Sequence, residues 1–150
     1  MTLIEIIAVV FSFLSVVYTV RKSIWSWIWG VLGIIFYGII FYQSNLYSNL
    51  LLQFIFIGQS IYGMRNWNNN TTNDVLFVEC MSICEKMECI IVSIVLSISV
   101  QYIFMDSEYP IMDSVTTSLS IVAYYLMSKR KIENWIFWIL ADIIYTYMFF

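Results

Sequence analysis

Six stretches of mostly apolar residues divide this chain, and each approaches the length of about 20 residues that an α-helix needs to cross a membrane. The chain has 150 residues, of which 61% are apolar. A soluble domain of that size cannot enclose so much apolar surface in one core, whereas a lipid bilayer can cover it. The sequence therefore predicts an all-α, polytopic helical membrane protein. The predicted spans are Leu3–Val20, Ile24–Tyr42, Leu46–Met64, Cys89–Met105, Ile111–Met127 and Trp135–Phe150.

The basic residues predict how these spans are oriented. If the six spans alternate in direction, all seven Lys and Arg residues fall on one side of the membrane. Loops on the cytoplasmic side of a membrane protein retain Lys and Arg. We therefore expect a multi-pass protein of the cell membrane with its N-terminus outside. The seven residues are Arg21, Lys22, Arg65, Lys86, Lys129, Arg130 and Lys131.

Composition disfavours several other classes of function. The chain has no His, and the spacing of Cys80, Cys84 and Cys89 fits no zinc site, so neither a metal nor another cofactor is expected. No basic patch is present that would suit a nucleic acid. No span holds a Ser–Lys pair or two acidic residues, so we do not expect an enzyme.

The sequence also resembles itself. At a shift of 109 positions, Arg21 aligns with Arg130 and Lys22 with Lys131. The first two spans then align with the last two, and the two copies point in the same direction. Such a pair is typical of a parallel repeat about an axis along the membrane normal.

This repeat predicts one transmembrane domain, residues 1–150, built as three helices, a linker helix and three more helices. Repeat one covers residues 3–67, and partial repeat two covers residues 111–150. An interfacial segment and the linker helix fill residues 75–105, with a short interfacial helix expected over Val75–Glu88. A third span of repeat two would follow residue 150, so a truncated helical membrane protein that does not transport is one alternative.

Polar side chains within the spans mark a candidate binding site. Asp142 is costly at membrane depth and is expected to face an internal cavity, because intramembrane acids are rarely structural. Trp135 and Trp138 share its helix face, at a spacing of i, i+3 and i+7. The complete set of candidate substrate-binding residues is Asn49, Gln53, Gln59, Ser60, Asn134, Trp135, Trp138 and Asp142.

The side chains of this set suit a small, planar solute with hydroxyl groups. Indole rings can stack on a heteroaromatic ring, and a cationic ring gains a further attraction. Amide groups such as those of Asn134 and Gln53 offer donors and acceptors to the hydroxyls of a sugar. A Trp pair can instead serve packing or an interfacial belt, and Asn and Gln within spans can instead join helices.

Two stretches resemble the PnuC family of nicotinamide riboside transporters. The first is Gly38–Trp67, which contains the pattern Q-x8-YG-x3-W from Gln53 onward. The second is Met112–Asp142, which contains the element ENWxxW at Glu133–Trp138. The resemblance runs from about Ile4 to Phe150 and is weakest from Thr71 to Tyr109.

The resemblance implies a SWEET-like fold, a bacterial cytoplasmic membrane and a homotrimer. It also implies facilitated diffusion of nicotinamide riboside, which a cytoplasmic kinase then traps by phosphorylation. Trp135 and Trp138 would form the aromatic wall, and Gln53, Asn134 and Asp142 would be polar contacts. Family members often carry Asn at the positions of Gly33 and Ser60, so thiamine and riboflavin remain alternative solutes.

Overall fold

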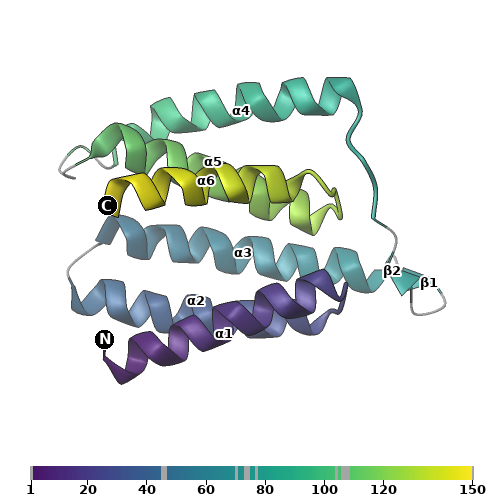
Figure 1. Cartoon of the computed structure of the whole chain (residues 1–150), viewed down its shortest axis with the longest axis horizontal. Coiled ribbons are helices and arrows are strands. Elements are labelled where there is room, and N and C mark those ends of the chain that lie inside the picture. Colours follow the sequence, from purple (N-terminus) through teal and green to yellow (C-terminus); the bar gives the residue numbers. More distant parts are fainter. Residues whose placement is uncertain are drawn as a thin grey trace. The chain divides into compact units, whose positions relative to one another are not determined.

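The protein is described by a computed structural model that covers residues 2–44, 47–69, 71–72, 75–76, 78–103, 105 and 109–149. Six helices account for most of these residues, which confirms the all-α fold class (Figure 1). They are α1 (Leu3–Val20), α2 (Trp25–Gln43), α3 (Tyr47–Asn69), α4 (Ile83–Gln101), α5 (Pro110–Ser128) and α6 (Asn134–Phe149). Two two-residue strands, β1 (Thr71–Thr72) and β2 (Val75–Leu76), pair antiparallel between α3 and α4.

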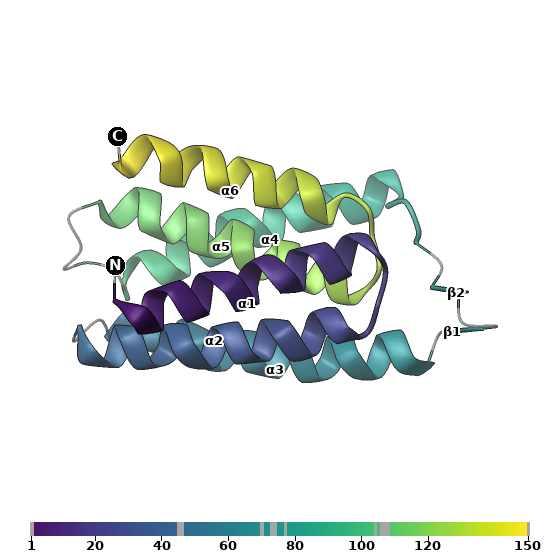
Figure 2. The ribbon, with the colours of Figure 1, turned by 60° about the horizontal axis from the view of Figure 1, so that its bottom comes forward.

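The chain divides into two compact units, Met1–Phe77 and Val78–Phe150. In the first unit α2 packs against both α1 and α3, and in the second unit α5 packs against both α4 and α6 (Figure 2). The expected linker helix, α4, therefore belongs structurally to the second unit.

Local sequence signals explain where several helices begin. Thr2 caps α1 and Ser82 caps α4, and in each case the Glu three residues later completes a capping box. Pro110 opens α5, where its missing N–H costs no helical hydrogen bond.

The helix expected over Val75–Glu88 is present only from Ile83 onward, and the expectation is wrong for the residues before it. Val75 and Leu76 form β2, and helix α4 begins only at Ile83. Between them, Glu79 pairs with the α5–α6 turn, where its N–H donates to the Arg130 carbonyl at 3.0 Å and its carbonyl accepts from Ile132 N–H at 3.0 Å. These hydrogen bonds satisfy the backbone in an extended form, so the segment does not need to become helical.

The turns α1–α2 and α5–α6 have the same hydrogen-bonding pattern. Ser23 N–H donates to the Tyr18 carbonyl and Lys22 N–H donates to that of Thr19, which is a Schellman motif with Lys22 at a φ of 56°. The corresponding donors in the second unit are Lys131 and Arg130, and Arg130 has a φ of 60°. All these bonds correspond at a shift of 108 positions.

The expected shift of 109 is therefore wrong by one residue at these turns. The shift of 109 aligned residues of the same type, so that Arg21 fell on Arg130. The helices before the two turns end at Val20 and Ser128, which are 108 positions apart. In the structural register Trp27 corresponds to Trp135, and Gly30 corresponds to Trp138.

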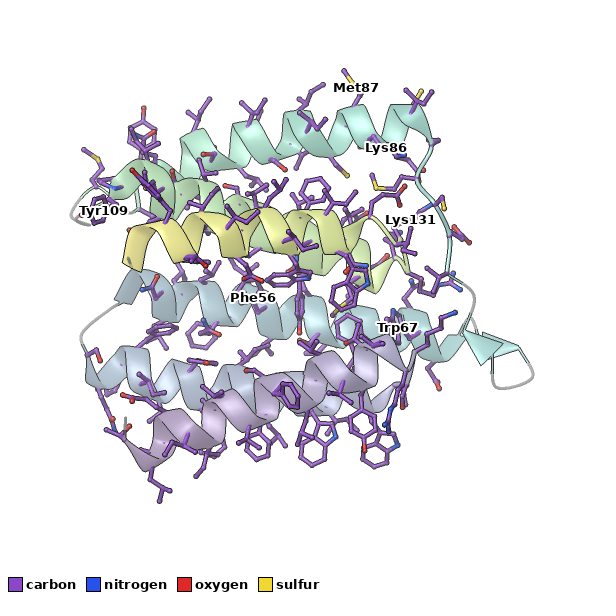
Figure 3. All side chains as sticks on the ribbon, in the orientation of Figure 1. Phe56, Trp67, Lys86, Met87, Tyr109 and Lys131 are labelled. Atoms are coloured by element: carbon purple, nitrogen blue, oxygen red, sulfur yellow. The ribbon has the colours of Figure 1, made fainter. Side chains whose placement is uncertain are left out.

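The core of the first unit forms around Trp27, which is completely buried. The rings of Trp27 and Trp67 pack edge to face, with 5.3 Å between their centroids. Gly63 lies directly against the ring of Trp27. Figure 3 shows Trp67 near the end of α3. The glycine is required here, since a Cβ at this position would overlap the indole.

The helices expose many large apolar side chains outward, among them Phe13 on α1, Ile94 on α4 and Ile143 on α6. Within the described residues, α1 and α2 meet a length and composition criterion for crossing a membrane, with mean hydropathies of 2.4 and 1.6. Both features suit helices that have a lipid bilayer as their solvent.

Candidate functional site

Helix α6 carries four of the eight candidate residues. Trp135, Trp138 and Asp142 lie within one continuous helix, so their spacing places them on one face. Trp135 and Trp138 are half-buried and Asp142 is exposed. The Trp138 ring packs edge to face against Tyr124 of α5, with 6.3 Å between the centroids. This contact fixes one edge of the indole.

Asn134 is the first residue of α6 and is only 6% exposed. Its Nδ2 donates to the Lys131 carbonyl at 2.6 Å. Its Oδ1 is buried and accepts no hydrogen bond from any residue that the structure describes. An unsatisfied buried acceptor costs about 1–3 kcal/mol, and a donor on a bound solute would remove that cost. The role of Asn134 as a solute contact stays a prediction.

Helix α3, in the first unit, carries the other four candidates. Asn49 and Gln53 are half-buried and one turn apart, and Gln53 Nε2 donates to the Asn49 carbonyl at 3.5 Å, which is a long hydrogen bond. Gln59 is half-buried. Ser60 is completely buried, and its hydroxyl donates to the Phe56 carbonyl of the preceding turn at 2.8 Å. Its hydroxyl proton is therefore committed to the helix.

The structure thus groups the candidates by helix, with Asn49 and Gln53 together on α3 and three α6 residues on one face. Whether the α3 and α6 groups line one cavity stays a prediction.

A cavity of about 560 Å³ lies within the second unit, between α4, α5 and α6. It is lined by Glu133, which directly precedes α6, and by Ile136, Phe137 and Leu140 of α6. On a helix these positions point away from the face that carries Trp135, Trp138 and Asp142. This cavity is therefore separate from the candidate site. Its remaining lining residues are Met81, Lys86, Ile90, Ser93, Ile94, Ser97, Ile98, Val115 and Leu119.

Sequence reasoning missed the buried hydroxyl groups of α5. Ser114, Thr116, Ser118 and Ser120 are all buried, and each hydroxyl donates to a backbone carbonyl three or four residues earlier. The helix thereby satisfies its own hydroxyls while keeping a surface of small side chains, which allows close helix packing. The signal was visible in the sequence as the run from Asp113 to Ser120.

Charged residues cluster where the 78–82 segment meets the α5–α6 turn. Both oxygens of the buried Glu133 carboxylate accept from Met81 N–H, at 2.9 and 3.0 Å, and Oε1 lies 3.3 Å from Lys86 Nζ. Lys131 Nζ lies 3.2 Å from Glu79 and 3.1 Å from Glu85. Figure 3 shows Lys86 and Lys131 at the same end of this unit. In the sequence, Glu133 is recognisable only as the first residue of the ENWxxW element.

Three of these groups have shifted pKa values, and the pKa of Glu85 is lowered mainly by its hydrogen bond from the Ser82 backbone N–H, with further hydrogen bonds from Lys131 and the Ser82 hydroxyl. Burial acts to raise the pKa of Glu133, but hydrogen bonds from Met81 N–H and its own backbone N–H, with Lys86 nearby, outweigh it and hold the pKa below 4.5. The Glu85 carboxylate raises the pKa of Lys131, against a smaller opposing effect of burial, and Glu79 adds to the increase. All three groups therefore stay charged at neutral pH.

The chain resembles known transporters over almost its whole length. A family model described as nicotinamide mononucleotide transporter matches residues 2–150. The nicotinamide riboside transporter PnuC of Escherichia coli is 25% identical to this chain over an alignment that is 176 residues long, gaps included. The alignment covers 97% of this chain and 73% of that protein. PnuC of Neisseria mucosa is 23% identical over 147 residues, which cover 92% of this chain and 56% of that protein.

A solved structure has the same fold. The crystal structure of the vitamin B3 transporter PnuC matches 95% of this chain with a TM-score of 0.78 and 22% identity. The chain spans 64% of the length of that protein. The fold is thus that of a helical membrane protein, and the matched family model establishes that this chain belongs to the nicotinamide mononucleotide transporter family.

Proposed function

We propose that this chain carries nicotinamide riboside across the cell membrane by facilitated diffusion. The observation that carries the proposal is the match of the transporter family over residues 2–150, together with a relative named for this solute that aligns with 97% of the chain. The family model is named for the mononucleotide. We favour the riboside because the relatives are named for it.

The α6 candidates fit the chemistry of this solute. Nicotinamide riboside has a flat, positively charged ring, and a Trp face attracts such a ring by about 2 kcal/mol once water is excluded. We assign that contact to Trp135 and Trp138, with the carboxylate of Asp142 complementing the charge. The ribose hydroxyls can donate to the unsatisfied Oδ1 of Asn134.

The α3 candidates complete the proposed site. Asn49, Gln53 and Gln59 offer amide groups to the ribose and the carboxamide, and Ser60 is proposed as a further polar contact.

In this proposal the N-terminus lies outside, so that the basic turns at Lys22 and Arg130 face the cytoplasm. Transport itself is passive and needs no catalytic group, and phosphorylation by a separate cytoplasmic kinase would drive net uptake. A homotrimer is the proposed assembly, by resemblance to the family.

Uptake by a Trp138→Ala variant tests the site. The full chain is reconstituted into liposomes, and the initial uptake rate of labelled nicotinamide riboside is measured over a range of concentrations. Loss of about 2 kcal/mol of ring contact predicts a rise in KM of about 30-fold. The control is Trp25→Ala, which removes a Trp that is 54% exposed at the start of α2, and its uptake should match the wild type. Normal uptake by Trp138→Ala would refute the assignment.

A further inference from the structure

Glu133 has partners that its turn does not require. The turns α1–α2 and α5–α6 form the same backbone hydrogen bonds, yet the position of Glu133 is occupied by Trp25 in the first. A carboxylate is therefore not needed to make the turn. It is present only in the unit where another segment, residues 78–82, lies against the turn.

Apart from a hydrogen bond with its own backbone N–H, the carboxylate of Glu133 reaches toward that segment and the helix after it. The carboxylate is bonded to Met81 N–H through both oxygens, and Lys86 in the first turns of α4 lies 3.3 Å away. The pairing of Glu79 with Arg130 and Ile132 adds two backbone hydrogen bonds beside it. Glu133 is only 8% exposed, so its hydrogen bonds with Met81 N–H lie largely out of water, whereas the Lys86 side chain is 51% exposed.

The proposed solute contacts of α6 begin directly after Glu133, and two of them show the connection most clearly. Asn134 is the next residue, and its side chain donates to the Lys131 carbonyl of the same turn. Trp138 comes one helical turn later on α6. Any displacement of the turn would move both side chains.

We infer that Glu133 is a positioning residue, which ties the 78–82 segment and α4 to the α5–α6 turn and thereby holds Asn134 and Trp138 in place during transport. Helices α4, α5 and α6 then move as one body. The inference rests on the proposed function for the role of the two solute contacts, whereas the tie itself is a property of the fold.

Hydrogen exchange on the full chain tests the tie. In Glu133→Ala the Met81 N–H loses its acceptor, so exchange in residues 79–86 and 134–138 should accelerate about tenfold or more. Glu133→Gln keeps one carbonyl oxygen for Met81 and should give an intermediate rate, which guards against failure of the Ala variant to fold. The control is Glu79→Gln, whose carboxylate is 55% exposed, and it should leave exchange in residues 134–138 unchanged.

Uptake kinetics then separate positioning from simple stability. A positioning role predicts that Glu133→Gln raises the KM for nicotinamide riboside while Vmax per folded chain stays near that of the wild type. A drop in Vmax with an unchanged KM, or unchanged exchange in residues 134–138, would overturn the inference. If the wild-type chain shows no uptake, the proposed function fails, and the exchange of residues 134–138 still decides whether Glu133 holds the start of α6.

Discussion

Replacing Gly63 with Ala should destabilise the first unit. A Cβ at Gly63 would lie 2.5 Å from Trp27 Cζ2 and 2.6 Å from Cζ3, whereas carbon atoms pack best at about 3.5–4.0 Å. The Trp27 ring is completely buried and braced by Trp67, so it cannot move aside without disturbing its other contacts. Overpacking of this kind costs about 1–3 kcal/mol, and the better helix propensity of Ala returns about 1 kcal/mol. We expect a net loss of up to about 2 kcal/mol.

Thermal unfolding of the purified chain in detergent, followed by tryptophan fluorescence, measures this loss. The matched control is Gly58→Ala on the same helix, because a Cβ at Gly58 would meet no atom within 4 Å. Gly58→Ala should be neutral or more stable than the wild type by up to about 1 kcal/mol. If Gly63→Ala is as stable as Gly58→Ala, the account of Trp27 packed on a required glycine is refuted.

Two further predictions concern charge. Asp142→Asn should raise the KM for nicotinamide riboside and thiamine, whose rings are positive, by about tenfold, while uptake of riboflavin should change little. An equal rise in KM for all three solutes would show that the carboxylate does not distinguish charged from neutral solutes. Glu133 has a folded-state pKa below its ordinary value of 4.5, so its contribution to stability is complete above that value and is lost as pH falls through the folded pKa. The difference in melting temperature between wild type and Glu133→Gln should therefore be constant near neutral pH and shrink below pH 4.5, and a difference that instead grew on acidification would contradict this.

The number and order of the helices could be predicted from the sequence because membrane helices are long and apolar, and the turns that separate them contain charged residues. The predicted span Leu3–Val20 coincides with α1, and Ile24–Tyr42 differs from α2 by one residue at each end. The chemical signal for such segments is local, so no knowledge of tertiary contacts is needed.

The start of α4 was missed although a local signal existed. Ser82 and Glu85 form a capping box, which the sequence displays, but the mixture of charged and apolar residues from Val75 onward suggested an amphipathic helix. The competing structure, an extended pairing of Glu79 with residues 130–132, joins positions about 50 apart and has no local signature.

The sequence predicted the repeat, but the shift that relates its two copies was wrong by one residue. Residue type favoured placing Arg21 on Arg130, whereas the Schellman geometry places Lys22 there. The left-handed backbone conformation at the end of a helix is usually adopted by Gly. A basic residue at that position therefore does not indicate from the sequence where the turn lies. The same one-residue change brings Trp135, rather than Trp138, into correspondence with a Trp of the first unit.

The candidate site was predicted in parts. The shared face of Trp135, Trp138 and Asp142 followed from helical spacing alone. The unsatisfied Oδ1 of Asn134 and the bond between Glu133 and Met81 depend on how the α5–α6 turn is packed, which the sequence does not encode locally.

The plateau of nicotinamide riboside uptake into liposomes that contain only this chain tests the central claim most directly. A facilitated-diffusion carrier predicts saturable entry, faster than into protein-free liposomes, that stops when the internal and external concentrations are equal. Entry no faster than into protein-free liposomes would contradict transport of this solute. A plateau well above equality under an imposed ion gradient, measured with the membrane potential held at zero so that the positive charge of the solute does not itself drive accumulation, would contradict the passive mechanism.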